Sequence, residues 1–262
     1  MKGVRFVLWM ICGFVLPPPV AGGDAAVVSE LKNTTLSTML TEFRGVGEWG
    51  FAALVEVDGR KVLFDTGWRP DTVLQNAREL GLDLSTVDTV IVSHNHADHS
   101  GGLVPLRRSL RDENAEALKN AHVGKGIFLP RQSDPQSLAI IPEPLRRFWV
   151  DIRDVRDEYE ALGGRITVHD EPHELLPGVW ITGPIPRRHP EKNWTSTAKI
   201  ERDGSLVEDT IPEDQALVIN TSEGLVVLAG CGHAGIVNTM EYARSIVAGK
   251  PVHAVFGGLH LM

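Results

Sequence analysis

The sequence predicts an α/β protein that folds as a four-layer αββα sandwich, in which two β-rich halves are each covered by helices. Two stretches indicate this class, because each runs from an apolar strand through a turn rich in glycine and histidine into an amphipathic helix: residues 88–110 and 225–247. The chain has 262 residues, and its 42% hydrophobic and 23% charged residues are typical of a globular protein. We therefore expect one large domain rather than two small ones.

Residues 1–23 have the pattern of a secretory signal peptide. Lys2 and Arg5 precede the apolar run 6–16, and three prolines and several small residues follow it. The run is about half as long as a helix that spans a bilayer, so we expect no stable membrane anchor once the leader is removed. The alternative is a buried first strand or helix, which consecutive prolines disfavour. The mature domain is then 24–262, exported to the periplasm or secreted.

The first part of this domain is predicted to form a meander of three strands: Thr34 to Phe43, Phe51 to Val57 and Lys61 to Phe64. Asp58-Gly59 is the hairpin turn between the second and third strands. The third strand ends at Asp65. This residue is either a polar residue of a surface turn or one that supports a nearby functional loop through hydrogen bonds. A helix capped by Asp71 or Thr72 follows and ends at Gly81.

A turn rich in metal-ligand residues follows the predicted strand Asp88 to Val92. Within six residues it contains three histidines and an aspartate: His94, His96, Asp98 and His99. Imidazole and carboxylate groups at this spacing suit a divalent ion such as zinc. Gly101-Gly102 allows a sharp turn into the helix predicted to end at Leu110. The sequence therefore predicts a metal site at the carboxyl end of a strand, and an ordinary polar loop is the disfavoured alternative.

The middle of the chain has weaker signals. Residues 111–144 contain many charges and four prolines, so we expect an irregular segment with a short strand at Gly126 to Leu129 and with His122 on the surface. A long helix is predicted from Leu145 to Leu162, because its apolar side chains recur at three and four residues. That apolar stripe is typical of core packing.

Two short strands are predicted next, at Arg165 to His169 and Val179 to Thr182. His169 and His173 flank an acidic turn, and both are expected to be solvated. A long polar loop, 183–215, includes Trp194 and is expected to cover the metal site, because long loops in compact domains are usually functional.

The second half repeats the pattern of the first. A hairpin of Ala216 to Thr221 and Leu225 to Ala229 leads into Gly230-Cys231-Gly232-His233, and a helix follows from about Ile236. A last strand, Val252 to Phe256, then presents His260 after two glycines.

The motif His94-x-His96-x-Asp98-His99 resembles the signature of the metallo-β-lactamase superfamily. Three further motifs agree with it: Leu63-Phe64-Asp65-Thr66-Gly67, Gly230-Cys231-Gly232-His233-Ala234-Gly235 and Gly257-Gly258-Leu259-His260-Leu261. The last two are similar to the branch that contains the dihydropterin synthase-like hydrolases of methanopterin biosynthesis. The resemblance runs from about Leu36 to the last residue, and it implies the αββα metallo-β-lactamase sandwich.

The resemblance also implies two zinc ions per chain and a set of six ligands: His94, His96, Asp98, His99, His233 and His260. The two histidines of the His-x-His pair would bind the first ion, and Asp98, His99 and His260 the second. The ligand that completes the first site stays open, with His233 ranked before Cys231 and His189. The relatives use the residue matching Asp65 to hold the metal loop by hydrogen bonds.

These ligands predict a zinc-dependent hydrolase. Two ions about 3.5–4 Å apart lower the pKa of a bridging water towards 7. We expect metal-bound hydroxide to attack a small ester, amide, lactone or phosphoester, with Asp98 orienting it or moving a proton. A histidine at position 96 disfavours the di-iron electron-transfer relatives, which prefer a carboxylate there. The net charge of −8 argues against a nucleic-acid partner and leaves a small-molecule substrate, with the oligomeric state open.

Two alternatives remain at this point. One is a dihydropterin synthase-like enzyme that forms a C–N bond, which the export signal disfavours because phosphorylated pterin precursors are cytoplasmic. The other is a degenerate metal-binding protein with little catalysis. Relatives continue past the Gly-Gly-x-His-Leu motif with another strand, whereas this chain ends at Met262, so we expect either a short variant or a missing C-terminus.

Overall fold

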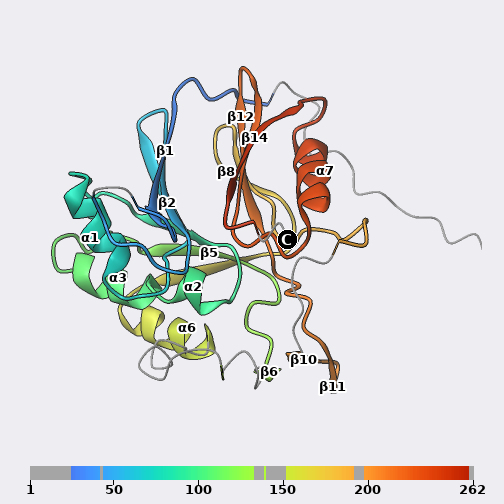
Figure 1. Cartoon of the computed structure of the whole chain (residues 1–262), viewed down its shortest axis with the longest axis horizontal. Coiled ribbons are helices and arrows are strands. Elements are labelled where there is room, and N and C mark those ends of the chain that lie inside the picture. The colour runs from blue at the N-terminus through green and yellow to red at the C-terminus, as the bar shows by residue number, and fades with distance from the viewer. Residues whose placement is uncertain (1–24, 42–43, 133–138, 140–151, 192–197, 260–262) are drawn as a thin grey trace, which may run out of the picture.

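The computed structural model describes residues 25–41, 44–132, 139, 152–191 and 198–259. Two large β-sheets lie face to face, and helices cover the outer face of each (Figure 1). The predicted four-layer αββα sandwich is therefore confirmed. This layering buries both faces of the central strands over part of their length, which explains the apolar runs 62–64, 90–92 and 225–229.

The first sheet has six strands in the order β1-β2-β3-β4-β5-β7. Their bounds are β1 Leu31–Ser37, β2 Ala52–Val57, β3 Arg60–Phe64, β4 Thr89–Val92, β5 Asn120–Gly124 and β7 Arg165–His169. The first three strands are antiparallel neighbours, and β3, β4, β5 and β7 run parallel. Three helices pack on its outer face: α1 Thr72–Glu79, α3 Leu103–Leu110 and α6 Ile152–Ala161.

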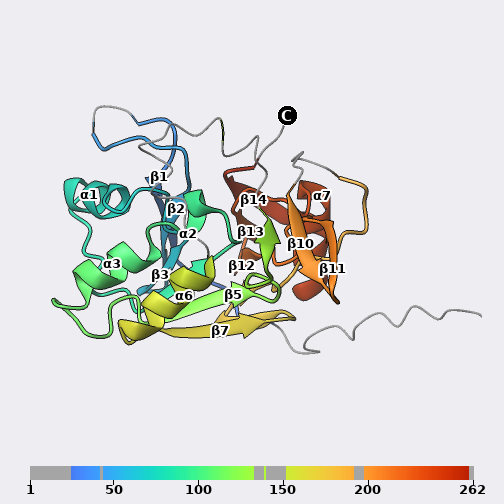
Figure 2. The same cartoon turned by 90° about the horizontal axis from the view of Figure 1, so that it is seen from below.

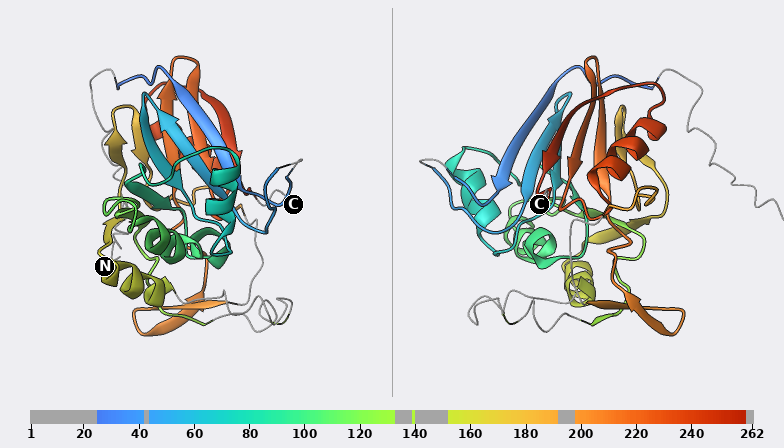
Figure 3. Two further views of the ribbon diagram at one scale, coloured as in Figure 1. Left: turned by 90° about the vertical axis from the view of Figure 1, so that its left-hand side faces the viewer. Right: turned by 45° about the vertical axis from the view of Figure 1, so that its right-hand side comes forward.

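The second sheet has five strands in the order β14-β13-β12-β9-β8. Their bounds are β8 His173–Leu176, β9 Val179–Ile181, β12 Ala216–Thr221, β13 Gly224–Ala229 and β14 Val252–Gly257. Helix α7, Ile236–Ile246, covers the outer face of this sheet (Figure 3). A small third sheet consists of β6 Arg131–Gln132, β10 Lys199–Arg202 and β11 Ser205–Glu208. The β10–β11 hairpin projects below the two large sheets in Figure 1 and therefore lies in front of them in Figure 2.

Strand β2 shows how the layers are held together. Leu54 packs in the core under the helices with Val73 of α1, whereas its neighbour Val55 faces the second sheet and packs in one cluster with Leu217 and Ile219. Burial of such side chains contributes about 1.5–3 kcal/mol each. Successive residues of one strand thus stabilise two different interfaces, which fixes the separation of the two sheets.

Several element boundaries differ from the predictions. Strand β1 begins and ends earlier than predicted, and β5 lies in the segment expected to be irregular, while the strand predicted at 126–129 forms turns. Asn120, Ala121 and Gly124 are weak β-formers, so only the pairing of β5 with strands on both sides reveals it. Helix α6 covers the C-terminal part of the helix predicted from Leu145, and the rest of that prediction lies outside the described residues.

The predicted leader, residues 1–23, also lies outside the described residues. Among the helices of the described part of the chain, none combines the length and the apolar character needed to cross a membrane.

Candidate metal centre

Two loops, one from each sheet, meet at the carboxyl ends of their strands. The ligand turn, residues 94–99, follows β4, and the loop 230–235 follows β13. A Cβ atom on Gly230 would collide with the Ser93 hydroxyl, so the loops approach this closely because residue 230 is glycine. Helix α2, Ala97–Ser100, carries the last part of the ligand turn. The predicted position of the site, at a strand end, is thus where the two sheets converge.

The two loops form two overlapping clusters of ligand atoms. In the first cluster the ligand atoms all lie within 4.8 Å of one another, and its members are His94, His96, Cys231 and His233. The second cluster meets the same limit and comprises Asp98, His99 and Cys231. The imidazole centroids are 4.7 Å apart for His94 and His96, and His233 lies 4.8 Å from each. Cys231 belongs to both clusters, so one thiol joins them.

The electrostatics of the clusters favours a cation. Burial lowers the pKa of His96 to about 4, although the Asp98 carboxylate opposes the shift, so this imidazole is neutral at pH 7 and keeps a lone pair. Burial raises the pKa of the Cys231 thiol, against the effect of His99. A divalent ion between these groups would stabilise the thiolate and accept the imidazole lone pairs. The donor set therefore fits a divalent metal.

The Asp65 side chain holds the ligand turn in place through hydrogen bonds. This side chain is fully buried, and its Oδ1 accepts the Ser93 backbone N–H at 2.7 Å. Its Oδ2 accepts the Ser93 hydroxyl and lies 2.7 Å from His99 Nδ1. With Nδ1 donating to the carboxylate, His99 turns Nε2 towards Cys231 Sγ at 3.0 Å. The predicted hydrogen bonds between Asp65 and the metal loop are present.

Residues 213–215 hydrogen-bond to the backbone of both metal loops, and these contacts were not predicted from the sequence. The Asn95 backbone N–H donates to Glu213 Oε1 at 3.3 Å, and the Ala234 N–H donates to Asp214 Oδ2 at 2.6 Å. Arg131 Nη2 lies 2.6 Å from Glu213 Oε2, which partly compensates the buried charge. The adjacent Gln215 N–H donates to the Ser93 carbonyl at 3.1 Å. Two adjacent acids at the end of the predicted loop 183–215 were the only local signal.

The loop 183–215 was expected to cover the site, and its two ends do contact the metal loops. Arg187 donates to the His233 carbonyl, and Glu213 holds the ligand turn as described above. The middle of the segment contains the hairpin of β10 and β11, which projects away from the two large sheets (Figure 3). Trp194 lies outside the described residues.

The geometry separates the three candidates for the ligand that completes the first metal site. His233 and Cys231 both lie in the first cluster, whereas His189 is 42% exposed and its Nε2 lies 2.9 Å from Glu241. His260 lies outside the described residues. The backbone that leads to it passes the site, because Gly258 N–H donates to the Gly230 carbonyl at 2.9 Å.

One of the two histidines predicted to be solvated, His169, is buried, and His122, predicted to lie on the surface, is partly buried. His169 is 7% exposed, and its Nε2 lies 2.8 Å from Nδ1 of His122, which is itself half-buried. The two residues are neighbours because β5 pairs with β7, a contact that the sequence analysis missed together with β5. His173 is exposed, as predicted.

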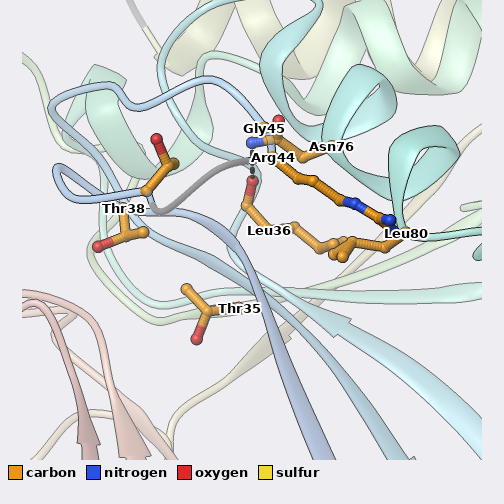
Figure 4. Close-up of a pocket in the computed structure, with 8 residues that line it drawn as sticks. Thr35, Leu36, Thr38, Arg44, Gly45, Asn76 and Leu80 are labelled. Carbon is orange, nitrogen blue, oxygen red and sulfur yellow. Dashed lines mark hydrogen bonds between the residues drawn. The ribbon is translucent and has the colours of Figure 1, made fainter.

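A separate small pocket lies between the end of β1 and helix α1 (Figure 4). Asn76 holds its wall by donating to the Leu36 carbonyl at 2.8 Å and by accepting the Val46 N–H at 2.7 Å. Its lining includes no member of the two ligand clusters. The Asn76 side chain thus anchors the segment after β1 to helix α1.

Comparison with known families agrees with this geometry. A family model described as the metallo-beta-lactamase superfamily matches residues 50–249. The chain belongs to the metallo-beta-lactamase superfamily. The match includes most strands of both sheets and both metal loops, and it ends before β14 and His260.

Individual relatives narrow the position within the superfamily. The chain is 28% identical over 247 residues to a 7,8-dihydropterin-6-methyl-4-(beta-D-ribofuranosyl)-aminobenzene-5'-phosphate synthase of Methanocaldococcus jannaschii, covering 90% of this chain and 80% of the synthase. The crystal structure of a metal-dependent hydrolase of the beta-lactamase superfamily matches with a TM-score of 0.65 at 28% identity, covering 89% of this chain and 78% of the hydrolase. The predicted resemblance to the dihydropterin synthase-like branch is confirmed.

Because Cys231 joins the two clusters and His233 belongs to one, their substitutions are expected to differ. His233→Ala should reduce bound zinc by about one ion per chain. Cys231→Ser should lower the affinity for both ions, because a neutral hydroxyl replaces a thiolate ligand. Metal content after zinc loading and dialysis, measured by mass spectrometry, checks this. His189→Ala is the matched control, and a loss of zinc from that variant alone would contradict the cluster assignment.

Proposed function

We propose that this member of the superfamily is a zinc-dependent hydrolase of a small ester, amide, lactone or phosphoester. The observation that carries the proposal is the convergence of the two ligand clusters on one thiol, at the carboxyl ends of strands from both sheets. The similar structure described as a metal-dependent hydrolase supports the same reaction class.

Zinc suits this donor set better than calcium or magnesium, because three imidazoles and a thiol are nitrogen and sulfur ligands. We propose that His94, His96, Cys231 and His233 hold one ion, and that Asp98 and His99, with His260, hold a second. Bound zinc supplies Lewis acidity and lowers the pKa of a coordinated water.

The residues of the chain supply orientation and proton transfer. Asp98 is the candidate for moving a proton, because its side chain is 16% exposed and its Oδ2 lies 3.5 Å from His99 Nε2. Asp65 keeps the His99 ring in place through the bond to Nδ1. Asp98 therefore lies between the buried ligand atoms and solvent. We propose that the substrate approaches the metal site from this side.

The segment after β1 exposes three apolar side chains, Met39, Leu40 and Trp49, and its end contacts the site because the Phe51 N–H donates to the Asp98 carbonyl at 3.2 Å. Contiguous exposed apolar patches often mark binding surfaces. We infer that these side chains contact an apolar part of the substrate.

A second candidate function has its own support. The similarity to the synthase extends along nearly the whole chain, so a C–N bond-forming reaction on a pterin precursor fits the same site. The predicted leader favours the hydrolase, since we propose on that basis that the protein is exported, away from cytoplasmic pterin precursors. A degenerate binding protein is disfavoured by the intact ligand clusters.

The deciding experiment starts from metal content. Full-length protein purified without chelator should contain about two zinc ions per chain and should hydrolyse at least one of a panel of nitrophenyl esters, lactones and phosphodiesters. Dialysis against a chelator should abolish the activity, and added zinc should restore it. Zinc-loaded protein that hydrolyses none of the panel, yet forms the product named for the similar synthase, would establish the second function instead.

A further inference from the structure

Three histidines outside the metal centre gather at one edge of the sandwich. His122 lies on β5, His169 ends β7 and His173 begins β8, so the turn 170–172 carries the chain from the first sheet to the second. None of the three belongs to either ligand cluster of the described residues. The strand order brings together residues that are 47 positions apart in the sequence.

Ring nitrogens of two of the three histidines are in contact, and the third ring lies beside this pair. Nδ1 of His122 lies 2.8 Å from Nε2 of His169, and the two rings are stacked with an interplanar angle of 16°. The His173 ring is the next neighbour, with its centroid 4.9 Å from that of His169. Two imidazole nitrogens that bind one ion at about 2.0–2.1 Å lie about 2.9–3.4 Å apart, so the His122–His169 pair is already close to that separation.

Burial and charge at this edge favour a cation. Burial lowers the pKa of His122 to about 4 and also lowers that of His169, and the neighbouring histidines add to both shifts, so both rings are neutral at pH 7. Asp170 and Glu171 on the turn and Glu174 of β8 are exposed near His173. Lys125 pairs with Asp170 at 3.2 Å, which leaves a net negative charge on the turn. Neutral imidazoles beside acidic groups attract divalent transition ions.

We propose that His122, His169 and His173 form a second metal site, which takes a divalent ion with a preference for imidazole, of the copper, nickel or zinc class. The exposed His173 ring turns about its side-chain torsions to complete the set, whereas the other two rings are held by the sheet. Binding breaks the hydrogen bond between His122 Nδ1 and His169 Nε2, and the ring that donated its hydrogen takes the other tautomer, so that both rings stay neutral and each offers a lone pair to the ion. The ion links an edge strand of the first sheet to an edge strand of the second.

The test uses copper(II) alone as the probe and does not depend on the proposed hydrolase. Full-length protein carrying His94→Ala and His96→Ala lacks two ligands of the predicted first site. It should still bind about one copper ion per chain with imidazole couplings in its electron paramagnetic resonance spectrum, in addition to any ion held by Asp98, His99 and Cys231. Adding His173→Gln should weaken this binding at least about tenfold, and adding His169→Gln should do the same. His173 is exposed, so its substitution leaves packing intact.

The matched control is His253→Gln, because His253 is an exposed histidine beside a carboxylate, with its Nε2 3.2 Å from Glu223. It should leave copper binding unchanged. Copper should also raise the melting temperature of the His94→Ala, His96→Ala protein, since the ion joins the two sheets. It should not raise the melting temperature once His173→Gln is added. Equal copper affinity in parent and His173→Gln, or an equal loss in His253→Gln, would overturn the site.

Discussion

Replacing Asp65 with alanine is expected to lower the free energy of unfolding by about 3–5 kcal/mol and to weaken zinc binding by about 10–100-fold. Three polar groups lose their acceptor at once: the Ser93 N–H, the Ser93 hydroxyl and His99 Nδ1. They lie in a buried environment where water cannot replace the carboxylate. Asp65 also has a φ of 58°, a backbone conformation that disfavours alanine.

The control for this prediction is Asp58→Ala. Asp58 is another aspartate with positive φ, at 47°, but it lies in the exposed hairpin turn between β2 and β3. Its substitution should cost about 1 kcal/mol and leave zinc binding unchanged. Chemical denaturation and zinc titration measure both effects. If Asp65→Ala and Asp58→Ala cost the same stability, Asp65 does not anchor the metal loop.

His96→Ala is expected to reduce any zinc-dependent hydrolysis by at least about 10³-fold, because metal catalysis supplies several kcal/mol and each 1.36 kcal/mol corresponds to a factor of ten. His94→Ala should do the same, since both rings line the first cluster. His96 is half-buried and His94 fully buried, so the loss of stability should be smaller for His96→Ala.

The measurements for this second prediction are metal content, hydrolysis rate and melting temperature of each variant. His253→Ala, an exposed substitution in β14, should retain full zinc and full activity. Undiminished zinc in both His94→Ala and His96→Ala would refute the first cluster as the metal site. Retained zinc with lost activity would instead assign these rings to catalysis rather than metal binding.

Much of the site was predictable because its residues are close in the sequence. His94, His96, Asp98 and His99 lie in one turn after an apolar strand, so local geometry holds their side chains together before any long-range contact forms. The same holds for Cys231 and His233, which follow β13. The layered fold was equally accessible, since hydrophobic periodicity and strand–turn–helix order are properties of short stretches.

The remaining features depend on contacts across the chain. His99 and Cys231 are 132 residues apart, and Glu213 is 118 residues from Asn95, so neither contact has a local signature. Strand β5 lacks strong β-formers and exists because β4 and β7 pair with it on both sides. That pairing is also what buries His169 against His122.

The fold class, the ligand turn and the types of donor atom thus follow from residue type and from spacing within a few residues. Three features became evident only in the folded chain: Cys231 belongs to both clusters, Glu213 and Asp214 hydrogen-bond to the two loops, and a second group of histidines converges. The physical reason is the order of strands in the sheets, which brings distant residues together and is set by the packing of the whole chain.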